Sequence, residues 1–272
     1  MISFDDMTWE ADRLRWRGLI FRLEDPARPV PGDDGLVLWK TEALVEQYRA
    51  FWAERPGFSA RQVFEVGLWK GGSVAFWAEA LQPERLVGVD LREASGSPVF
   101  ESYLAAHAPR LAAHWAVDQL DQGRLRALVE SAFEGPLDLV IDDASHLYAP
   151  TRASFEALFP LLRPGGLYVI EDWAWAHWPR FQGSASPFAR QIPLTRLVDE
   201  LVAATGSGDM VRAVSVRRGF VAVERGPRPT PEPFTLDAAI SWPVRPPRSL
   251  RRLLGELVSE LVARLRAGRI RG

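Results

Sequence analysis

Two short apolar runs in the sequence each end in a pair of acidic residues. The first run spans residues 139–141 and the second spans residues 167–170. The acids that follow these runs, together with a histidine three residues beyond the first pair, are Asp142, Asp143, His146, Glu171 and Asp172. Carboxylates and an imidazole grouped in this way could bind a metal ion or move a proton, provided that the fold brings them to one place.

The residues around these acids predict a β-α-β unit that would do so. Both apolar runs suit strands that are buried on two faces, and apolar residues recur at helical spacing between residues 150 and 162. Pro164, Gly165 and Gly166 end that helix and turn the chain. The two strands are then parallel and close neighbours, so their carboxyl ends lie at the sheet edge where open α/β sheets bind ligands.

The chemistry of the cluster favours a bound cation. Carboxylates a few ångströms apart repel each other, and a hard divalent ion with oxygen ligands relieves that repulsion. Asp143, Glu171 and Asp172 are the predicted ligands. His146 lies beyond the strand end, where it could take a proton from a metal-polarised hydroxyl. Asp142 either caps the following turn or bonds a cofactor; ordinary N-capping is the alternative for any single acid, but two pairs at successive strand ends favour a functional site.

A glycine-rich turn upstream predicts a cofactor site at the same sheet edge. Residues 62–68 read as a strand that ends beside Gly67, and Gly71 and Ser73 precede a helix through residue 81. Such a turn lets a ligand approach the backbone and offers the helix N-terminus to polar groups. The phosphate-binding Gly-x-Gly-x-x-Gly spacing is absent, which argues against a pyrophosphate cofactor such as NAD.

The next two predicted strands add candidate cofactor contacts. The strand at residues 85–91 carries Asp90 at its end, where an acid can accept hydrogen bonds from both hydroxyls of a ribose; capping of its own loop is the alternative. A short third strand at residues 114–117 leads into Asp118 and Gln119, either of which could bond an adenine amino group.

Composition excludes several classes of function. The chain has 272 residues, no cysteine and a net charge of −2, so we expect no disulfide, no thiolate metal site, no cysteine nucleophile and no nucleic-acid partner. The N-terminal residues do not read as a signal peptide, and no apolar run approaches the length of a membrane span. A cytoplasmic protein is therefore expected.

The chain divides into four predicted segments. Residues 1–60 are expected to form a helical or lid segment, with a helix and then a strand within residues 9–23, and residues 61–226 the sheet domain. Residues 227–248 are rich in proline and predict an extended linker. Residues 249–272 predict a basic amphipathic helix, for which docking on its own domain is a better hypothesis than contact with an anionic membrane or a partner chain.

Two further segments of the sheet domain bear on the site. Residues 173–178, Trp-Ala-Trp-Ala-His-Trp, follow a strand end and should line the substrate mouth with aromatic rings. Residues 210–217 and 219–224 alternate apolar and polar side chains on either side of a turn. They predict a hairpin whose second strand is antiparallel to the rest of the sheet.

Taken together, the motifs resemble those of class I S-adenosylmethionine-dependent methyltransferases, and within that class the macrocin and mycinamicin sugar O-methyltransferases. Residues 65–73, Glu-Val-Gly-Leu-Trp-Lys-Gly-Gly-Ser, are similar to the family's first motif. Residues 117–121, 142–146 and 162–172 are similar to its later motifs. The resemblance covers about residues 36–180. The departures from the family pattern are Val117, Leu120 and Ala144.

The resemblance implies an α/β fold: a doubly wound, mostly parallel, Rossmann-like sheet of seven strands with an antiparallel last strand, and helical additions at the N- and C-termini. It implies S-adenosylmethionine and Mg²⁺ as cofactors and a hydroxyl of a sugar or glycosylated metabolite as the methyl acceptor. The residues that it assigns are Asp143, Glu171 and Asp172 to the metal, His146 to the base, Glu65, Gly67 and Ser73 to the methionine part, Asp90 to the ribose, Asp118 or Gln119 to the adenine, and Gly71 to cofactor binding. Asp142 stays a candidate cofactor contact.

Two other functions remain open at this stage, as does a homo-oligomer. One is a hydroxylase of the cephalosporin hydroxylase type, although His146 and His177 give no clear two-histidine, one-carboxylate set. The other is a non-catalytic assembly protein on the same fold, because a fold alone does not fix a function. Retention of all the acids together with His146 favours an enzyme.

Overall fold

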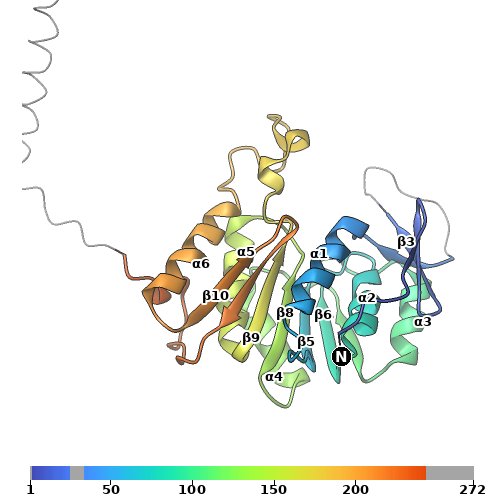
Figure 1. The fold of residues 1–272 in the computed structure, drawn as a ribbon, viewed down its shortest axis with the longest axis horizontal. Coiled ribbons are helices and arrows are strands. Elements are labelled where there is room, and N and C mark those ends of the chain that lie inside the picture. The colour runs from blue at the N-terminus through green and yellow to red at the C-terminus, as the bar shows by residue number, and fades with distance from the viewer. Residues whose placement is uncertain (1, 25–33, 243–272) are drawn as a thin grey trace, which may run out of the picture. The chain divides into compact units, whose positions relative to one another are not determined.

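The computed structural model describes residues 2–24 and 34–242, of which those up to Ile240 form one compact unit (Figure 1). The predicted basic helix at residues 249–272 and the last part of the predicted linker lie outside the described residues. Within the described residues, no helix has the length and apolar character needed to span a membrane.

A sheet of seven strands forms the centre of the unit, in the order β10-β11-β9-β8-β5-β6-β7. The strands are β5 (Gln62–Val66), β6 (Arg85–Val89), β7 (Leu111–His114), β8 (Leu137–Asp142), β9 (Leu162–Glu171), β10 (Val211–Val216) and β11 (Phe220–Arg225). Five of them, β5 to β9, pair in parallel, whereas β11 pairs antiparallel with both β9 and β10. This confirms the predicted mostly parallel sheet and its antiparallel last strand.

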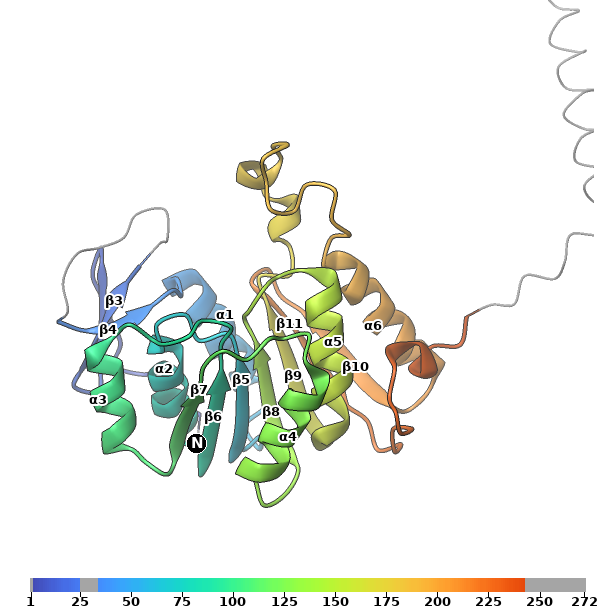
Figure 2. The same cartoon turned by 180° about the vertical axis from the view of Figure 1, so that it is seen from behind.

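Helices cover both faces of this sheet (Figures 1 and 2). They are α1 (Glu42–Ala53), α2 (Gly72–Leu81) and α3 (Pro98–Ala106) on one face, and α4 (Gln122–Ala132), α5 (Tyr148–Leu158) and α6 (Thr195–Ser207) on the other. Successive strand residues point to opposite cores: Val63 packs with the first set of helices and Phe64 with the second. The strands are therefore apolar on both faces, as the continuous runs in the sequence predict.

The N-terminal segment differs from the predicted helix and strand, because it forms a small sheet before α1. Its strands are β1 (Thr8–Trp9), β2 (Arg13–Trp16), β3 (Leu19–Leu23) and β4 (Leu36–Leu38), in that order. Arg17 and Gly18 both have positive φ, which makes the two-residue turn of a β2–β3 hairpin. Trp16 and Phe21 then pack on Phe76 of α2.

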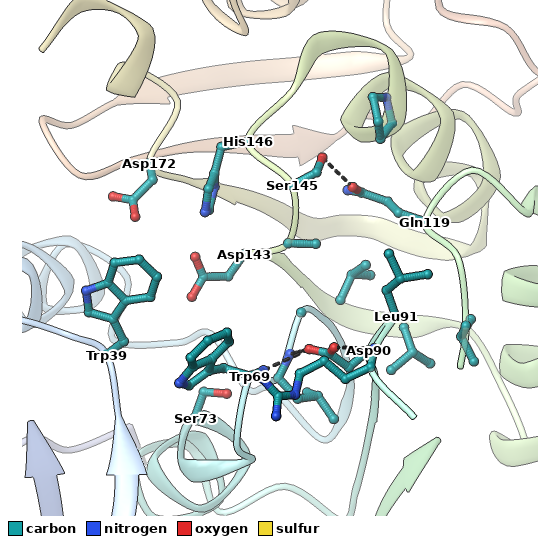
Figure 3. Close-up of a pocket in the computed structure, with 18 of the residues that line it drawn as sticks. Trp39, Trp69, Ser73, Asp90, Leu91, Gln119, Asp143, Ser145, His146 and Asp172 are labelled. Carbon is teal, nitrogen blue, oxygen red and sulfur yellow. Dashed lines mark hydrogen bonds between the residues drawn. The ribbon is translucent and has the colours of Figure 1, made fainter. Parts of the chain in front are cut away.

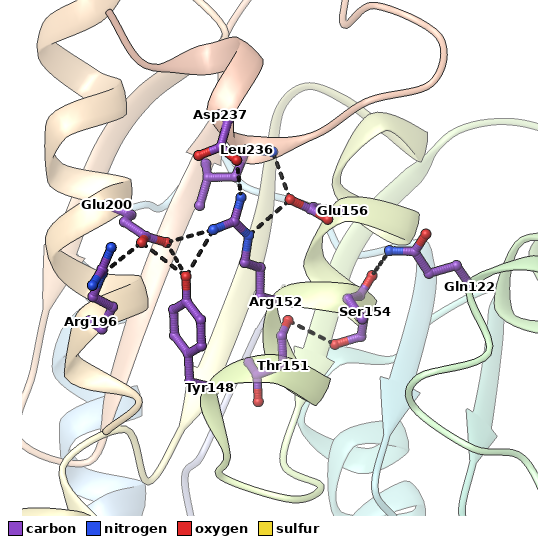
Figure 4. A network of polar contacts seen from close by, with 11 residues as sticks. Gln122, Tyr148, Thr151, Arg152, Ser154, Glu156, Arg196, Glu200, Leu236 and Asp237 are labelled. Carbon is purple, nitrogen blue, oxygen red and sulfur yellow. Dashed lines mark hydrogen bonds and ion pairs between the residues drawn. The ribbon is translucent and has the colours of Figure 1, made fainter. Parts of the chain in front are cut away.

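The described part of the predicted linker also differs, because it packs on the domain. Phe234, Leu236 and Ile240 are buried in the core beneath α5 and α6. Arg152 of α5 joins this segment to the helices: it donates to Asp237 and contacts Glu200 of α6, which also accepts from the hydroxyl of Tyr148 (Figure 4). Apolar residues spaced among the prolines thus fix the chain as far as Ile240.

Candidate active site

The glycine turn between β5 and α2 folds as close to its neighbours as the sequence predicts. Gly67 has φ +94°, its amide donates to the carbonyl of Val89 at 2.8 Å, and a Cβ there would overlap the backbone of Asp143. Gly71 has φ +86° and stands at the N-cap of α2, where a Cβ would overlap the ring of Phe100. Both positions therefore require glycine. Gly71 shapes the turn without lining the cavity above it.

That cavity has a volume of about 490 Å³ and lies at the carboxyl ends of β4, β5, β6 and β8 (Figure 3). The predicted residues that line it are Gly67, Ser73, Asp90, Asp118, Gln119, Asp143, His146 and Asp172. Figure 3 shows Asp143, His146 and Asp172 gathered at one end and Asp90 with Leu91 at the other. Cofactor and acid candidates thus share one cavity.

Glu65 and Ser73 provide unsatisfied polar atoms beside this cavity. Glu65 is fully buried, and within the described residues neither its carboxylate oxygens nor the hydroxyl of Ser73 form a well-aligned hydrogen bond, although Ser73 lies close enough to Glu65 to favour its ionised form. Burial raises the pKa of Glu65 to about 8. Buried acceptors without donors are costly, so this pair fits a ligand that brings a donor, such as the ammonium group of an amino acid.

Asp90 is used by its own turn. One carboxylate oxygen accepts from the amides of Leu68 and Trp69 at 2.7 and 2.8 Å, and the other accepts from the amide of Arg92 at 2.8 Å. This is the loop-capping role weighed above as the alternative. Asp90 still lines the cavity, and the oxygen that accepts from Arg92 keeps a second lone pair, so the ribose assignment stays a prediction.

Asp142 does not line the cavity. It is buried, and its oxygens accept from Gln119, from Ser154 at 2.5 Å and from the hydroxyl of Tyr168 at 2.7 Å. Burial raises its pKa to about 6. The side chain amide of Gln119 is occupied by this bond while its oxygen accepts from Ser145. The structure thus places Asp142 against Gln119 and outside the cavity lining, and its contact with a cofactor stays a prediction.

The acid cluster has a different composition from the predicted one. Asp143, His146 and Asp172 each offer a ligand atom, and these atoms lie within 4.8 Å of one another, which is the only such group among the described residues. His146 reaches this place because its φ is +55°, and its ring lies 4.4 Å from that of Trp175. The cluster could hold a metal ion through two carboxylates and one imidazole.

Glu171 is held apart from this group by a lysine that the sequence did not single out. Both oxygens of Glu171 lie 2.7 Å from the Nζ of Lys40, and one also accepts from the hydroxyl of Tyr48. The same Nζ lies 3.0 Å from Asp143. Lys40 and Glu171 are each 1% exposed, and Glu171 does not line the cavity. The charge of one predicted ligand is thus compensated from within the protein.

Burial sets the protonation of the cluster. It lowers the pKa of His146 to about 4, so the imidazole is neutral at physiological pH, against the opposing effect of Glu171. Burial and the neighbouring Asp143 and Glu171 raise the pKa of Asp172 to about 8. A cation bound between Asp143 and Asp172 would favour the ionised form of both carboxylates, which otherwise repel each other.

Comparison with known proteins agrees with this site. Residues 64–173 match the family model described as "Methyltransferase domain". The chain is 38% identical over 149 residues to demethylmacrocin O-methyltransferase of Streptomyces fradiae, which covers 52% of this chain and 34% of that protein. It is 36% identical over 193 residues to 8-demethyl-8-alpha-L-rhamnosyl tetracenomycin-C 2'-O-methyltransferase of Streptomyces olivaceus, covering 64% and 47% respectively.

Comparison of the fold with solved structures also finds methyltransferases. A structure of the MycE methyltransferase from the mycinamycin biosynthetic pathway, in complex with Mg, SAH and mycinamycin VI, superposes with a TM-score of 0.52 and 31% identity, over 70% of this chain and 50% of that one. The chain contains a methyltransferase domain related to these sugar O-methyltransferases. It spans about a third to a half of the length of the curated relatives that it matches.

Several residues of the methyltransferase domain's cavity had no sequence signal of their own. Lys40 and Trp39 come from the β4–α1 connection, far from the motifs in sequence. Leu91 and Leu120 are 69% and 53% exposed although they are large and apolar, and both line the cavity, where they offer apolar surface to a planar ring. Leu120 was noted only as a departure from the family motif. Of the predicted aromatic segment, Trp173 does not line this cavity; it is partly buried and packs against the core on the α4–α6 face of the sheet.

Proposed function

We propose that this chain transfers a methyl group from S-adenosylmethionine to a hydroxyl of a sugar or glycosylated metabolite. The observation that carries the proposal is a single cavity that is lined by Ser73 beside a glycine turn, with the buried Glu65 behind it, and that has Asp143, His146 and Asp172 gathered at one end. The two curated relatives named above are O-methyltransferases, and the name of one of them includes a rhamnosyl compound, which supports the choice of acceptor.

The residues present fit the cofactor. Glu65 and Ser73 would receive the ammonium and carboxylate end of the methionine part, because their buried polar atoms form no well-aligned hydrogen bond within the described residues. Asp90 would accept from the ribose. Leu91 and Leu120 would enclose the adenine between apolar side chains, and Asp118 would bond its edge.

The residues also fit a hard divalent ion. Asp143 and Asp172 would supply the oxygen ligands that Mg²⁺ prefers, and the imidazole of His146 would lie beside the ion without binding it. Glu171 would act through Lys40, since both of its oxygens already accept from the buried ammonium. When bound, S-adenosylmethionine supplies the methyl group and the ion supplies positive charge beside the acceptor oxygen.

His146 would take the proton of the attacking hydroxyl. Burial keeps its imidazole neutral at physiological pH, which leaves a lone pair free for the proton. Its contact with Trp175 holds the ring beside Asp143 and Asp172. A base fixed in this position also aligns the acceptor, and alignment supplies much of the rate of a direct displacement.

The cluster does not favour the hydroxylase alternative. Non-haem iron oxygenases use two histidines and one carboxylate, whereas this group, the one found among the described residues, has two carboxylates and one histidine.

The test is an incubation with S-adenosylmethionine that carries a labelled methyl group, against a panel of glycosylated small molecules and their aglycones, read by mass spectrometry. We expect label in the sugar part of at least one glycoside and none in the aglycones, with loss of transfer in EDTA. Transfer to nothing in the panel by a chain that binds the cofactor would argue against a sugar acceptor. A chain that binds NAD in the cavity and not S-adenosylmethionine would overturn the proposal.

A further inference from the structure

A second cavity of about 570 Å³ adjoins the first. Its walls come from the N-terminal sheet, the β4–α1 connection, residues 175–180 after β9, and the β10–β11 turn. It shares Leu38, Trp39, Lys40 and Asp172 with the cofactor cavity. A molecule bound in it would therefore reach the acid cluster while the first cavity is filled by another molecule.

The walls of the second cavity combine aromatic faces with hydrogen-bonding groups. Four tryptophans line it: Trp9, Trp39, Trp175 and Trp178. The ring centroids of Trp39 and Trp175 are 5.4 Å apart, and those of Trp175 and Trp178 are 5.9 Å apart, so three of the rings form a continuous wall. Aromatic faces bind the apolar C–H faces of a ring, and a few polar groups fix its orientation.

Two arginines supply the polar side of this cavity. The guanidinium of Arg180 lies 5.0 Å from the ring of Trp178 and has no carboxylate partner among the ion pairs of the described residues. Arg218, on the β10–β11 turn, is exposed and likewise forms no ion pair with a described residue. Of the glutamates that line the same cavity, Glu24 is paired with Lys70 at 2.9 Å and Glu10 with Arg15 at 2.8 Å, while Glu42 forms no ion pair with a described residue. Free guanidinium donors beside aromatic rings suit the hydroxyl and ether oxygens of a sugar.

We propose that the second cavity binds the sugar ring of the acceptor, and that the N-terminal sheet and residues 175–180 determine which glycoside is accepted. The proposal rests on the methyl-transfer function proposed above and adds the place and the specificity elements for the acceptor. It gives the N-terminal sheet a function besides packing: Trp9 of β1 presents its side chain to the cavity while Trp16 of β2 anchors the sheet on α2.

The N-terminal sheet is also joined to the glycine turn between β5 and α2 by hydrogen bonds from that turn to Glu24. Glu24, directly after β3, accepts from the indole of Trp69 at 3.4 Å and from Lys70 at 3.0 Å. Trp69 lines the first cavity and Glu24 lines the second. These bonds therefore fix the part of the second cavity that the N-terminal sheet lines relative to the first cavity.

The test uses the full chain and two readouts. Binding of methyl α-L-rhamnopyranoside and methyl α-D-glucopyranoside at millimolar concentration is followed by saturation-transfer NMR, and methyl transfer to the acceptor found in the panel is followed by mass spectrometry. The variants are Trp9→Ala and Trp178→Ala. Trp115→Ala is the matched control, because Trp115 packs near Phe100 and lines neither cavity.

We expect each cavity variant to raise the KM for the acceptor about tenfold, the factor that corresponds to one lost aromatic contact of roughly 1.4 kcal/mol. The sugar signal should weaken in the same variants, while S-adenosylmethionine affinity stays unchanged and Trp115→Ala behaves as wild type. Wild-type KM and sugar signal in both folded cavity variants, or no signal from either sugar with the wild type, would overturn the proposal. If the wild-type chain gives a sugar signal that Trp178→Ala removes but transfers no methyl group, the proposed function is refuted and the proposal of a sugar-binding cavity is supported.

Discussion

Removing the charge of Lys40 should destabilise the protein strongly. In Lys40→Met the side chain keeps its length and loses its ammonium, which leaves the hydroxyl of Tyr48 as a hydrogen-bond donor to Glu171 but removes the compensating charge. Both members of the pair are 1% exposed, so solvent cannot replace the lost charge. Breaking a buried ion pair by removing one partner costs about 3–5 kcal/mol, and we expect a loss of unfolding free energy in that range.

The assay is urea unfolding followed by circular dichroism at pH 8 in EDTA, above the pKa of about 6 that burial gives Glu171, so that the carboxylate is ionised in wild type. Arg15→Met is the control, because Arg15 pairs with Glu10 through side chains that are 50% and 42% exposed, and exposed pairs contribute roughly 0–1 kcal/mol. The double variant Lys40→Met/Glu171→Gln should regain part of the loss, since it removes the uncompensated charge. Equal losses in the two single variants, with no rescue in the double variant, would refute the reasoning.

Three other predictions concern the cavity. His146→Ala should lower kcat by roughly 10²–10⁴-fold, the usual contribution of a general base, and leave cofactor affinity unchanged by calorimetry; a kcat within a few-fold of wild type would remove the base assignment. Asp172→Asn should weaken Mg²⁺ binding, measured by calorimetric titration, and abolish most turnover, and full activity in excess EDTA would contradict a metal role. S-adenosylmethionine affinity should rise with pH from 6 to about 7.5, because burial raises the pKa of Glu65 to about 8 and an ammonium ligand selects its ionised form. The gain should be at most tenfold per pH unit and should level off near the pKa of the ligand's own amino group, about 7.7–8.0; Glu65→Gln should abolish it, and a flat profile in wild type would contradict the contact.

The central part of the fold could be predicted from the sequence because its signals are local. Continuous apolar runs that end in acids, separated by a helical segment, can hardly form anything other than parallel strands with their carboxyl ends together. The close approach of Gly67 to the Asp143 backbone follows from the same logic, since a glycine at a strand end permits it. The sequence therefore predicts that Asp143, His146 and Asp172 lie close together, and the structure has them within 4.8 Å of one another.

The remaining features depend on contacts between distant residues. Lys40 meets Asp143 across 103 positions of sequence, and nothing near it distinguishes it from a surface lysine. The β2–β3 hairpin depends on positive φ at Arg17 and Gly18, a pair without the usual Asn-Gly or Asp-Gly signal. Asp142 and Asp143 are neighbours, so they point to opposite faces of the strand end, and the sequence does not say which of them faces the cavity.

The most direct test of the account is a crystal structure of the chain grown with S-adenosylhomocysteine and Mg²⁺. We expect the amino group of the ligand at Glu65 and Ser73, and its adenine between Leu91 and Leu120. We expect the ion on Asp143 and Asp172, with the Lys40–Glu171 pair intact. A ligand bound outside this cavity, or an ion held by Glu171 with Lys40 displaced, would contradict it.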